Sequence, residues 1–157
     1  LSAADAAFSG AVDAAVLIQE SARAAGININ VVREPNDGYW SNVWRKKAWC
    51  ACYWGGRPTE DWMFTTTHKK GGDWNDTHFT HEGFQKLLVE ARSVLDEAKR
   101  REMYVEMQRI VRDEGGTAVP MFANYIWAKS KKVAHPDQMA ANWDLDGQKY
   151  IERWWLT

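Results

Sequence analysis

The stretch that decides the fold is residues 48–64, AWCACYWGGRPTEDWMF. It begins with an apolar and aromatic run at residues 49–54, breaks at Gly55-Gly56, and resumes as a short helical pattern at Thr59. In α/β proteins, a strand that ends in a glycine turn and leads into a helix opens a crevice at its carboxyl end, where ligands commonly bind. We therefore expect this stretch to border a binding site.

Composition limits the class of protein and its partners. The chain has 157 residues, of which 45% are hydrophobic and 26% charged, as is typical of a globular domain. Its net charge of −1 argues against nucleic acid or an anionic membrane bound through bulk charge. Ten tryptophans are unusual, and because this side chain is large, rigid and amphipathic, we expect several of them to line a ligand site.

The cysteines are Cys50 and Cys52, two positions apart. On a strand both would face one side, with their Cα atoms roughly 6.5–7 Å apart, which is at or beyond the usual limit for a disulfide. We therefore expect two mostly buried thiols. A Cys-x-Cys metal pair is an alternative that would need histidine partners.

The N-terminal part has the pattern of half a βαβ unit. An alanine-rich helix is predicted at residues 11–25, with Ser9 as its N-cap and Gly26 at its C′ position. Residues 27–33 then alternate as a strand with one buried face. Helix, glycine and strand in this order indicate the α/β class.

The remaining pattern contains more helices than strands. Asp96 is a predicted N-cap, and Gly115-Gly116 is a predicted helix stop. The tail from residue 133 is rich in large apolar groups but has little regular pattern. The predicted elements are helices at 39–47, from Thr59, at 80–93 and at 96–113, strands at 49–54 and 117–128, and a loop at 69–77.

An ordered set of short motifs resembles the C-terminal part of the family 5 extracellular solute-binding proteins. These are the dipeptide-, oligopeptide- and nickel-binding components of ABC importers. The match covers nearly the whole chain, and its pieces are Ala25-Gly26-Ile27, Tyr39-Trp40, residues 49–53, Gly56-Arg57-Pro58, Asp61, Trp74-Asn75, residues 96–108 and Val119-Pro120.

The resemblance implies a C-terminal fragment of a two-lobed protein that closes over its ligand. The fold would be α/β, the C-terminal lobe portion of a type II periplasmic-binding-protein fold, with a mixed sheet flanked by helices. Residues 1–128 would form the second-lobe portion, and 129–157 a tail returning through the hinge to the missing first lobe. The location would be periplasmic, with membrane permease subunits as partners and the signal peptide outside this fragment. The tail at 143–155 could also mediate self-association.

The resemblance also suggests contact residues. Trp49 matches a tryptophan beside the ligand, whereas Cys52 occupies the position of an aspartate that pairs with a peptide's α-amino group. A neutral thiol cannot replace that carboxylate, so we expect a small solute that is held differently. It would be a peptide or peptide-like molecule, with a sugar or an opine-like conjugate as alternatives. Lys46 or Lys47 could hold a carboxylate. The predicted ligand-binding residues are Trp49, Cys52, Tyr53, Trp54, Arg57, Asp61, Trp74 and Asn75.

Other functions remain as alternatives. His78 and His81, three residues apart near a helix start, suggest a metal-chelate binder of the nickel type. A thiol-dependent enzyme would pair Cys50 or Cys52 with His68 or His81, but the sequence has no nucleophile elbow, P-loop, dinucleotide fingerprint or HExxH motif. Arg57 could simply hold the glycine turn through backbone carbonyls. We therefore predict a non-catalytic binding protein without cofactor or metal ligands.

Overall fold

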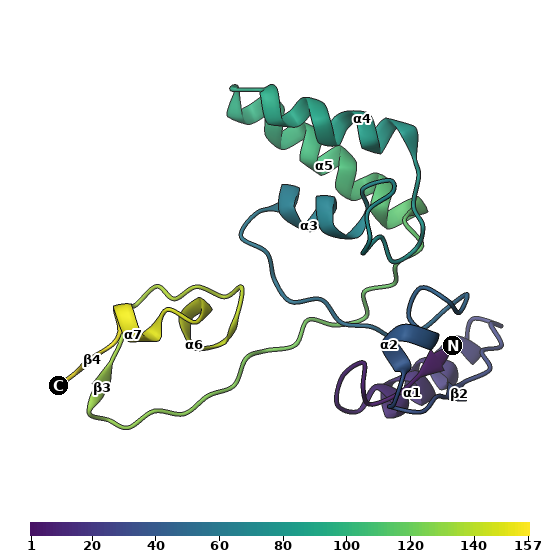
Figure 1. Cartoon of the computed structure of the whole chain (residues 1–157), viewed down its shortest axis with the longest axis horizontal. Coiled ribbons are helices and arrows are strands. Elements are labelled where there is room, and N and C mark those ends of the chain that lie inside the picture. Colours follow the sequence, from purple (N-terminus) through teal and green to yellow (C-terminus); the bar gives the residue numbers. More distant parts are fainter. The chain divides into compact units, whose positions relative to one another are not determined.

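The computed structural model describes all residues from 1 to 157 (Figure 1). The chain divides into two compact units. Unit 1 is Leu1–Trp54 and unit 2 is Gly55–Thr157. Each is described by itself below. None of the helices has the length and apolar character needed to cross a membrane.

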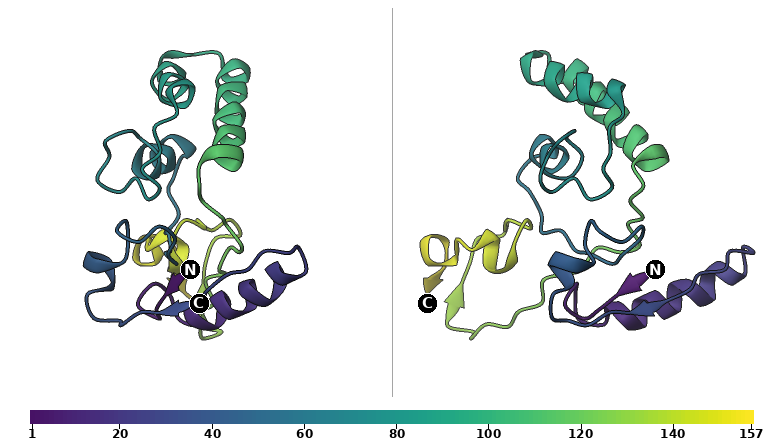
Figure 2. Two further views of the ribbon diagram at one scale, coloured as in Figure 1. Left: turned by 90° about the vertical axis from the view of Figure 1, so that its right-hand side faces the viewer. Right: turned by 45° about the vertical axis from the view of Figure 1, so that its right-hand side comes forward.

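Unit 1 is built on a short parallel strand pair with a helix beside it. Strand β1 (Ser2–Ala3) leads through helix α1 (Ala11–Arg23) to strand β2 (Val32–Arg33), which pairs parallel with β1 in the register Ser2↔Val32. Helix α1 lies against β1 (Figure 2). On the other side of β1, Ser2 forms a parallel bridge with Cys50. Three chain segments thus run in the same direction, and β1 lies in the middle.

The ends of α1 depend on two glycines. Gly26 has φ +75°, its N–H donates to the Arg23 carbonyl, and the Ile27 N–H donates to the Ala22 carbonyl. This confirms Gly26 as the C′ residue, since the left-handed conformation is cheap only for glycine. Ser9 was the wrong N-cap, because Gly10 occupies that position with φ +81° and no side chain caps the first turn.

Small side chains allow close packing in unit 1. Its core consists of Ala4, Ala7, Ala11, Tyr39 and Val43, and Cys50 and Ala51 pack against it. Tyr39 begins helix α2 (Tyr39–Asn42), which the sequence predicted to continue to residue 47. Helix α2 ends early, and Arg45 adopts φ +58°, a left-handed conformation that no right-handed helix contains.

Unit 2 contains three helices around an aromatic core. Helix α3 is Glu60–Thr67, helix α4 is Glu82–Glu90 followed by the 3-10 turn η1 (Ala91–Ser93), and helix α5 is Glu97–Glu114. Helices α4 and α5 lie side by side in Figures 1 and 2. The buried side chains are Phe64, Phe79, Phe84, Leu88, Ala91 and Met107.

The helix starts in unit 2 are capped by side chains. Thr59 accepts from the Trp62 N–H at 3.2 Å, and Asp96 accepts from the Lys99 N–H at 3.0 Å. Gly115 is the C-cap of α5, and Gly116 follows it with φ +69°. The predicted start and stop of α5 are therefore confirmed. Each cap accepts or orients backbone groups that a helix end leaves without partners.

The C-terminal part of unit 2 folds on itself. Strands β3 (Val133–Ala134) and β4 (Trp155–Leu156) pair antiparallel, and the short helices α6 (Asp144–Gly147) and α7 (Tyr150–Arg153) lie between them in sequence. The buried Asp146 accepts from the Ala140 N–H at 2.6 Å and from Arg153 at 2.9 Å. The parallel pair and the antiparallel pair form two separate two-stranded sheets rather than one mixed sheet, and together with the helices they agree with the predicted α/β class.

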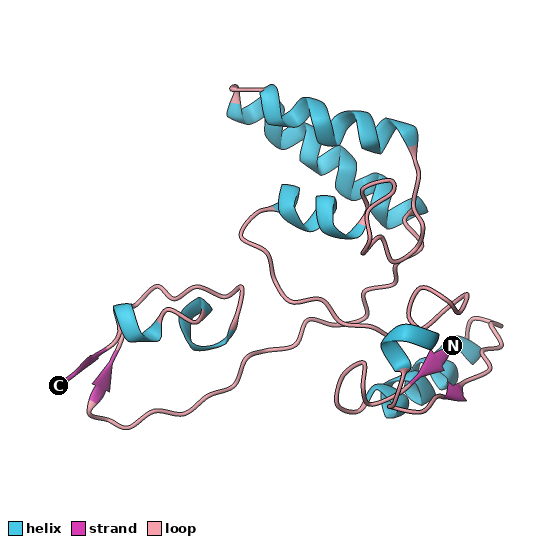
Figure 3. Ribbon diagram, in the orientation of Figure 1, coloured by secondary structure: helices cyan, strands magenta, loops and turns pink.

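The long predicted strands were wrong in extent. Only Val32–Arg33 of the 27–33 strand is regular, and the 49–54 strand is reduced to the bridge at Cys50. The 117–128 strand is absent, so this segment is a long loop between α5 and β3 (Figure 3). There Phe122 is 90% exposed and Ile126 is 94% exposed. A strand needs a neighbouring strand for its backbone hydrogen bonds. In the structure these segments have little or no pairing with a neighbouring strand.

Candidate functional site

Four aromatic side chains of unit 1 contact one another edge to face and form what we call the aromatic ledge: Trp40, Trp44, Tyr53 and Trp54. The ring centroids of Trp40 and Trp44 are 5.9 Å apart, and those of Trp40 and Tyr53 are 5.8 Å apart. Trp44 contacts Trp54 at 6.5 Å. Such contacts hold each ring in place without filling its outer face.

The sequence of α2 explains how the ledge arises. Tyr39 and Val43 are buried one helical turn apart, and this orientation turns Trp40 and Trp44 away from the core. The Tyr39 hydroxyl donates to the Ala51 carbonyl at 2.7 Å and so fixes the segment that carries Tyr53. Trp40 and Trp44 were not among the predicted site residues, although their i, i+4 spacing was a signal for them.

The ledge is accessible and has basic residues close to it in sequence. Trp40 is 40% exposed and Tyr53 is 63% exposed. The Arg45 guanidinium carbon lies 5.8 Å from the centre of the Trp44 ring, a distance at which cation–π attraction operates. Lys46 and Lys47 follow Arg45 directly. The arrangement can hold a flat apolar group against aromatic rings and attract an anionic group from the same solute.

The residues that precede Tyr53 in this segment differ in solvent exposure. Trp49 is 44% exposed, and its carbonyl accepts from the Ser2 N–H at 3.0 Å. Cys50 and Cys52 are half-buried and are not joined in a disulfide.

Burial raises the pKa of the Tyr39 hydroxyl, and the nearby thiols and Glu34 raise it further. The phenol therefore stays protonated and remains a hydrogen-bond donor to the segment.

The four other predicted residues lie in unit 2. Arg57 donates from Nη1 to the carbonyls of Gly55 at 3.0 Å and Gly56 at 3.2 Å, so it holds the glycine turn. A Cβ added at Gly56 would lie 2.7 Å from the Asn142 carbonyl oxygen. The turn therefore packs closely on this part of the C-terminal segment, and only glycine fits there.

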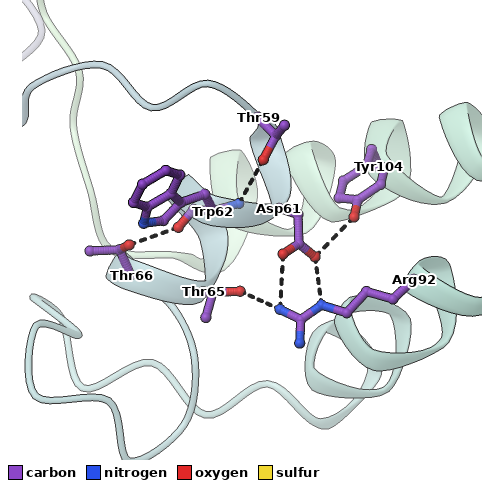
Figure 4. Close-up of polar contacts among 7 residues, drawn as sticks. All are labelled: Thr59, Asp61, Trp62, Thr65, Thr66, Arg92 and Tyr104. Carbon is purple, nitrogen blue, oxygen red and sulfur yellow. Dashed lines mark hydrogen bonds and ion pairs between the residues drawn. The ribbon is translucent and has the colours of Figure 1, made fainter. Parts of the chain in front are cut away.

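Asp61 joins α3 to the turn η1 and to helix α5 (Figure 4). Arg92 donates from Nε and Nη2 to its two carboxylate oxygens, each at 2.9 Å, and the Tyr104 hydroxyl donates at 3.0 Å. Burial opposes ionisation of Asp61, but the hydrogen bonds from Arg92 and Tyr104 outweigh it and lower the pKa. The carboxylate thus has strong partners within the chain.

Trp74 and Asn75 differ in exposure although they are adjacent. Trp74 is 51% exposed, whereas Asn75 is 3% exposed. The Asn75 amide donates to the Phe79 carbonyl at 2.8 Å and accepts from the Phe79 N–H at 2.9 Å. Asn75 therefore closes the loop before α4 from within.

The histidines of the metal-chelate alternative are not neighbours on a helix. His78 lies in the loop with φ +56°, and His81 is the N-cap of α4. The Nδ1 atom of His81 accepts from the Phe84 N–H at 3.0 Å, so the neutral ring carries its proton on Nε2, the atom 3.7 Å from Glu114. A protonated Nε2 has no lone pair for a metal.

A surface hollow of about 360 Å³ lies beside His81, lined by residues 77–81 and 114–116. The structure contains no group of three or more His, Cys, Asp or Glu side chains that could hold a metal ion.

Comparison with known proteins supports the fold. No family model matches the sequence, and no curated protein matches it. Among solved structures, NikZ from Campylobacter jejuni in complex with Ni(L-His) is similar, with a TM-score of 0.61 and 19% sequence identity over 73% of this chain. The chain spans 24% of that protein. It has the α/β fold of a lobe portion of a periplasmic binding protein.

Proposed function

We propose that this chain belongs to the solute-binding component of an ABC importer, which captures a small solute between two lobes and performs no catalysis. The observation that carries the proposal is the aromatic ledge, in which Tyr53 and Trp54 follow the carboxyl end of the parallel segment at residues 49–51. In open α/β sheets ligands bind beyond the carboxyl ends of the strands. The fold shared with NikZ supports the same function.

The ledge favours a particular kind of solute. Trp40 and Tyr53 offer exposed ring faces, and residues 45–47 supply positive charge next to them in sequence. A peptide-like solute with a flat apolar side chain and a carboxylate would use both features. Trp49, Cys52 and Trp54 would complete the contact surface. In unit 2, Arg57, Asp61, Trp74 and Asn75 remain predicted ligand residues, of which Trp74 is the most exposed.

The exposed segment at residues 117–128 supports the proposed domain organisation. Its large apolar side chains would be covered if residues 1–128 formed a lobe portion and residues 129–157 returned through a hinge to a first lobe. The protein would then act in the periplasm with membrane permease subunits. We expect residues 1–157 to self-associate when nothing else covers the exposed apolar segment at 117–128. Analytical ultracentrifugation of residues 1–157 tests this expectation.

A metal chelate is the second candidate, because NikZ was crystallised with nickel and L-histidine. A chelate can be held through its organic part, so this candidate does not require His78 or His81 as ligands. Nickel without an organic chelator should then leave the thermal stability unchanged.

Native mass spectrometry of the full protein that carries this chain, purified without added ligand, tests the proposal. Denaturing the sample should release a small solute whose mass identifies its class. Trp40→Ala and Tyr53→Ala should each reduce the bound fraction at least tenfold, whereas the matched control Trp62→Ala, an exposed tryptophan of α3, should not. Equal retention in all three variants would place the solute elsewhere and contradict the proposal.

A further inference from the structure

The two cysteines flank a residue whose backbone is held from two directions. The Ala51 N–H donates to the Ser2 carbonyl at 2.9 Å, and the Ala51 carbonyl accepts from the Tyr39 hydroxyl at 2.7 Å. Cys50 itself bridges parallel to Ser2. The segment is therefore extended at this point, and in extended backbone the side chains two positions apart project to the same side.

The spacing of the pair suits a shared metal ion better than a disulfide. Extended residues two positions apart have Cα atoms roughly 6.5–7 Å apart, at the upper end of what a disulfide allows. A metal ion between two thiolates separates the sulfur atoms by about 4.6 Å, twice a typical zinc–sulfur bond. The longer bridge removes the strain that a direct sulfur–sulfur bond would impose.

Cys50 lies beside the apolar core of unit 1. The Cys50 and Cys52 side chains are half-buried. Both thiols raise the pKa of the Tyr39 hydroxyl, after the larger effect of burial. Soft thiolate ligands select monovalent copper, and two ligands satisfy such an ion, whereas structural zinc takes four.

We propose that Cys50 and Cys52 together bind one soft monovalent metal ion, Cu(I) or its analogue Ag(I), as a two-coordinate dithiolate. Each thiol releases its proton to solvent, so two protons leave for each ion bound and no electron is transferred. The resulting site carries one negative charge. This inference shares Cys52 with the proposed solute contacts, but it rests on the two thiols and does not require that the aromatic ledge bind a solute.

Silver titration of the reduced protein in chloride-free buffer without oxygen tests the site. Native mass spectrometry should show one ion per chain, with a mass increase of one silver minus two hydrogens. Cys50→Ser and Cys52→Ser should each weaken binding at least a hundredfold. The matched control Met121→Leu removes an exposed thioether and should leave binding unchanged. Tight one-to-one binding in either serine variant would overturn the proposal.

A second measurement needs no variant and therefore does not depend on the folding of the serine substitutions. One equivalent of Ag(I) should slow alkylation of both thiols together in the wild-type protein, at least tenfold. Removal of Ag(I) with excess thiosulfate, followed by desalting, should restore the reaction. Protection of only one thiol, or of neither, would contradict a shared site.

Discussion

The helical part of unit 2 and the ledge-bearing segment of unit 1 respond differently to equally strong sequence patterns. Helix α5 begins after Asp96 and stops at Gly115, as its caps and periodicity predict. Residues 49–54 are far more apolar than α5, yet they form only one bridge, at Cys50. A helix satisfies its backbone locally, whereas a strand depends on neighbours. Aromatic side chains on such a segment remain exposed and available for a ligand.

The largest expected effect concerns the helical core. Phe84 is fully buried and contacts Phe64 and Phe79 with ring centroids 5.4 and 5.2 Å apart. Phe84→Ala should lower the free energy of unfolding by about 3–5 kcal/mol, because it removes apolar contacts and leaves a cavity. Urea denaturation measures the loss. Leu95→Ala, at a 91% exposed position, is the control and should change stability by less than about 0.5 kcal/mol.

A buried histidine in the same core makes it sensitive to acid. Burial lowers the pKa of His68 to about 4, from an ordinary value of 6.5. The folded state disfavours the charged ring. The contribution of the neutral ring to the free energy of unfolding is therefore complete above pH 6.5 and is lost as pH falls towards 4. The loss should reach about 3 kcal/mol. Urea denaturation at pH 7, 5.5 and 4 measures it.

The matched variants for this effect are His68→Phe and His78→Asn. His68→Phe should flatten the pH dependence between 6.5 and 4. His78→Asn should retain the wild-type slope, because asparagine tolerates the positive φ of that position. An unchanged slope in His68→Phe would show that another group causes the acid sensitivity.

In unit 1 the Tyr39 hydroxyl supports the segment that carries part of the aromatic ledge. Tyr39→Phe removes the donor to the Ala51 carbonyl and should lower the free energy of unfolding by about 1–2 kcal/mol. Amide hydrogen exchange should speed up in residues 49–54 and stay unchanged in α5. Equal acceleration in both regions would mean that the hydroxyl has no particular role at the ledge.

The smallest expected effect is at Asp61. Asp61→Asn breaks the two-pronged contact with Arg92 and should cost about 1 kcal/mol, because the pair is partly exposed to solvent. The exposed Arg112–Asp113 pair is the control, so Asp113→Asn should leave the thermal transition unchanged. A double-mutant cycle with Arg92→Gln isolates the interaction between Asp61 and Arg92. A coupling near zero would show that the contact does not hold α3 in place.

Features set by nearby residues were predictable from the sequence. The Gly26 helix end and the Asp96 cap follow from local backbone chemistry. The strand lengths were not predictable, since pairing depends on distant segments. The Arg92 partner of Asp61, which is 31 residues away, left no signal in the spacing. For the ledge, the sequence indicated Tyr53 and Trp54 through the glycine turn, but not that Trp40 would lie against Tyr53.

The most direct test of the solute-binding account is calorimetric titration of the full protein with the solute identified by native mass spectrometry. The account predicts that Trp40→Ala and Tyr53→Ala each weaken affinity at least tenfold, because each removes an exposed ring face of the ledge. Trp62→Ala should bind as the wild type does. Wild-type affinity in both ledge variants, or a full protein that binds no solute, would contradict the account.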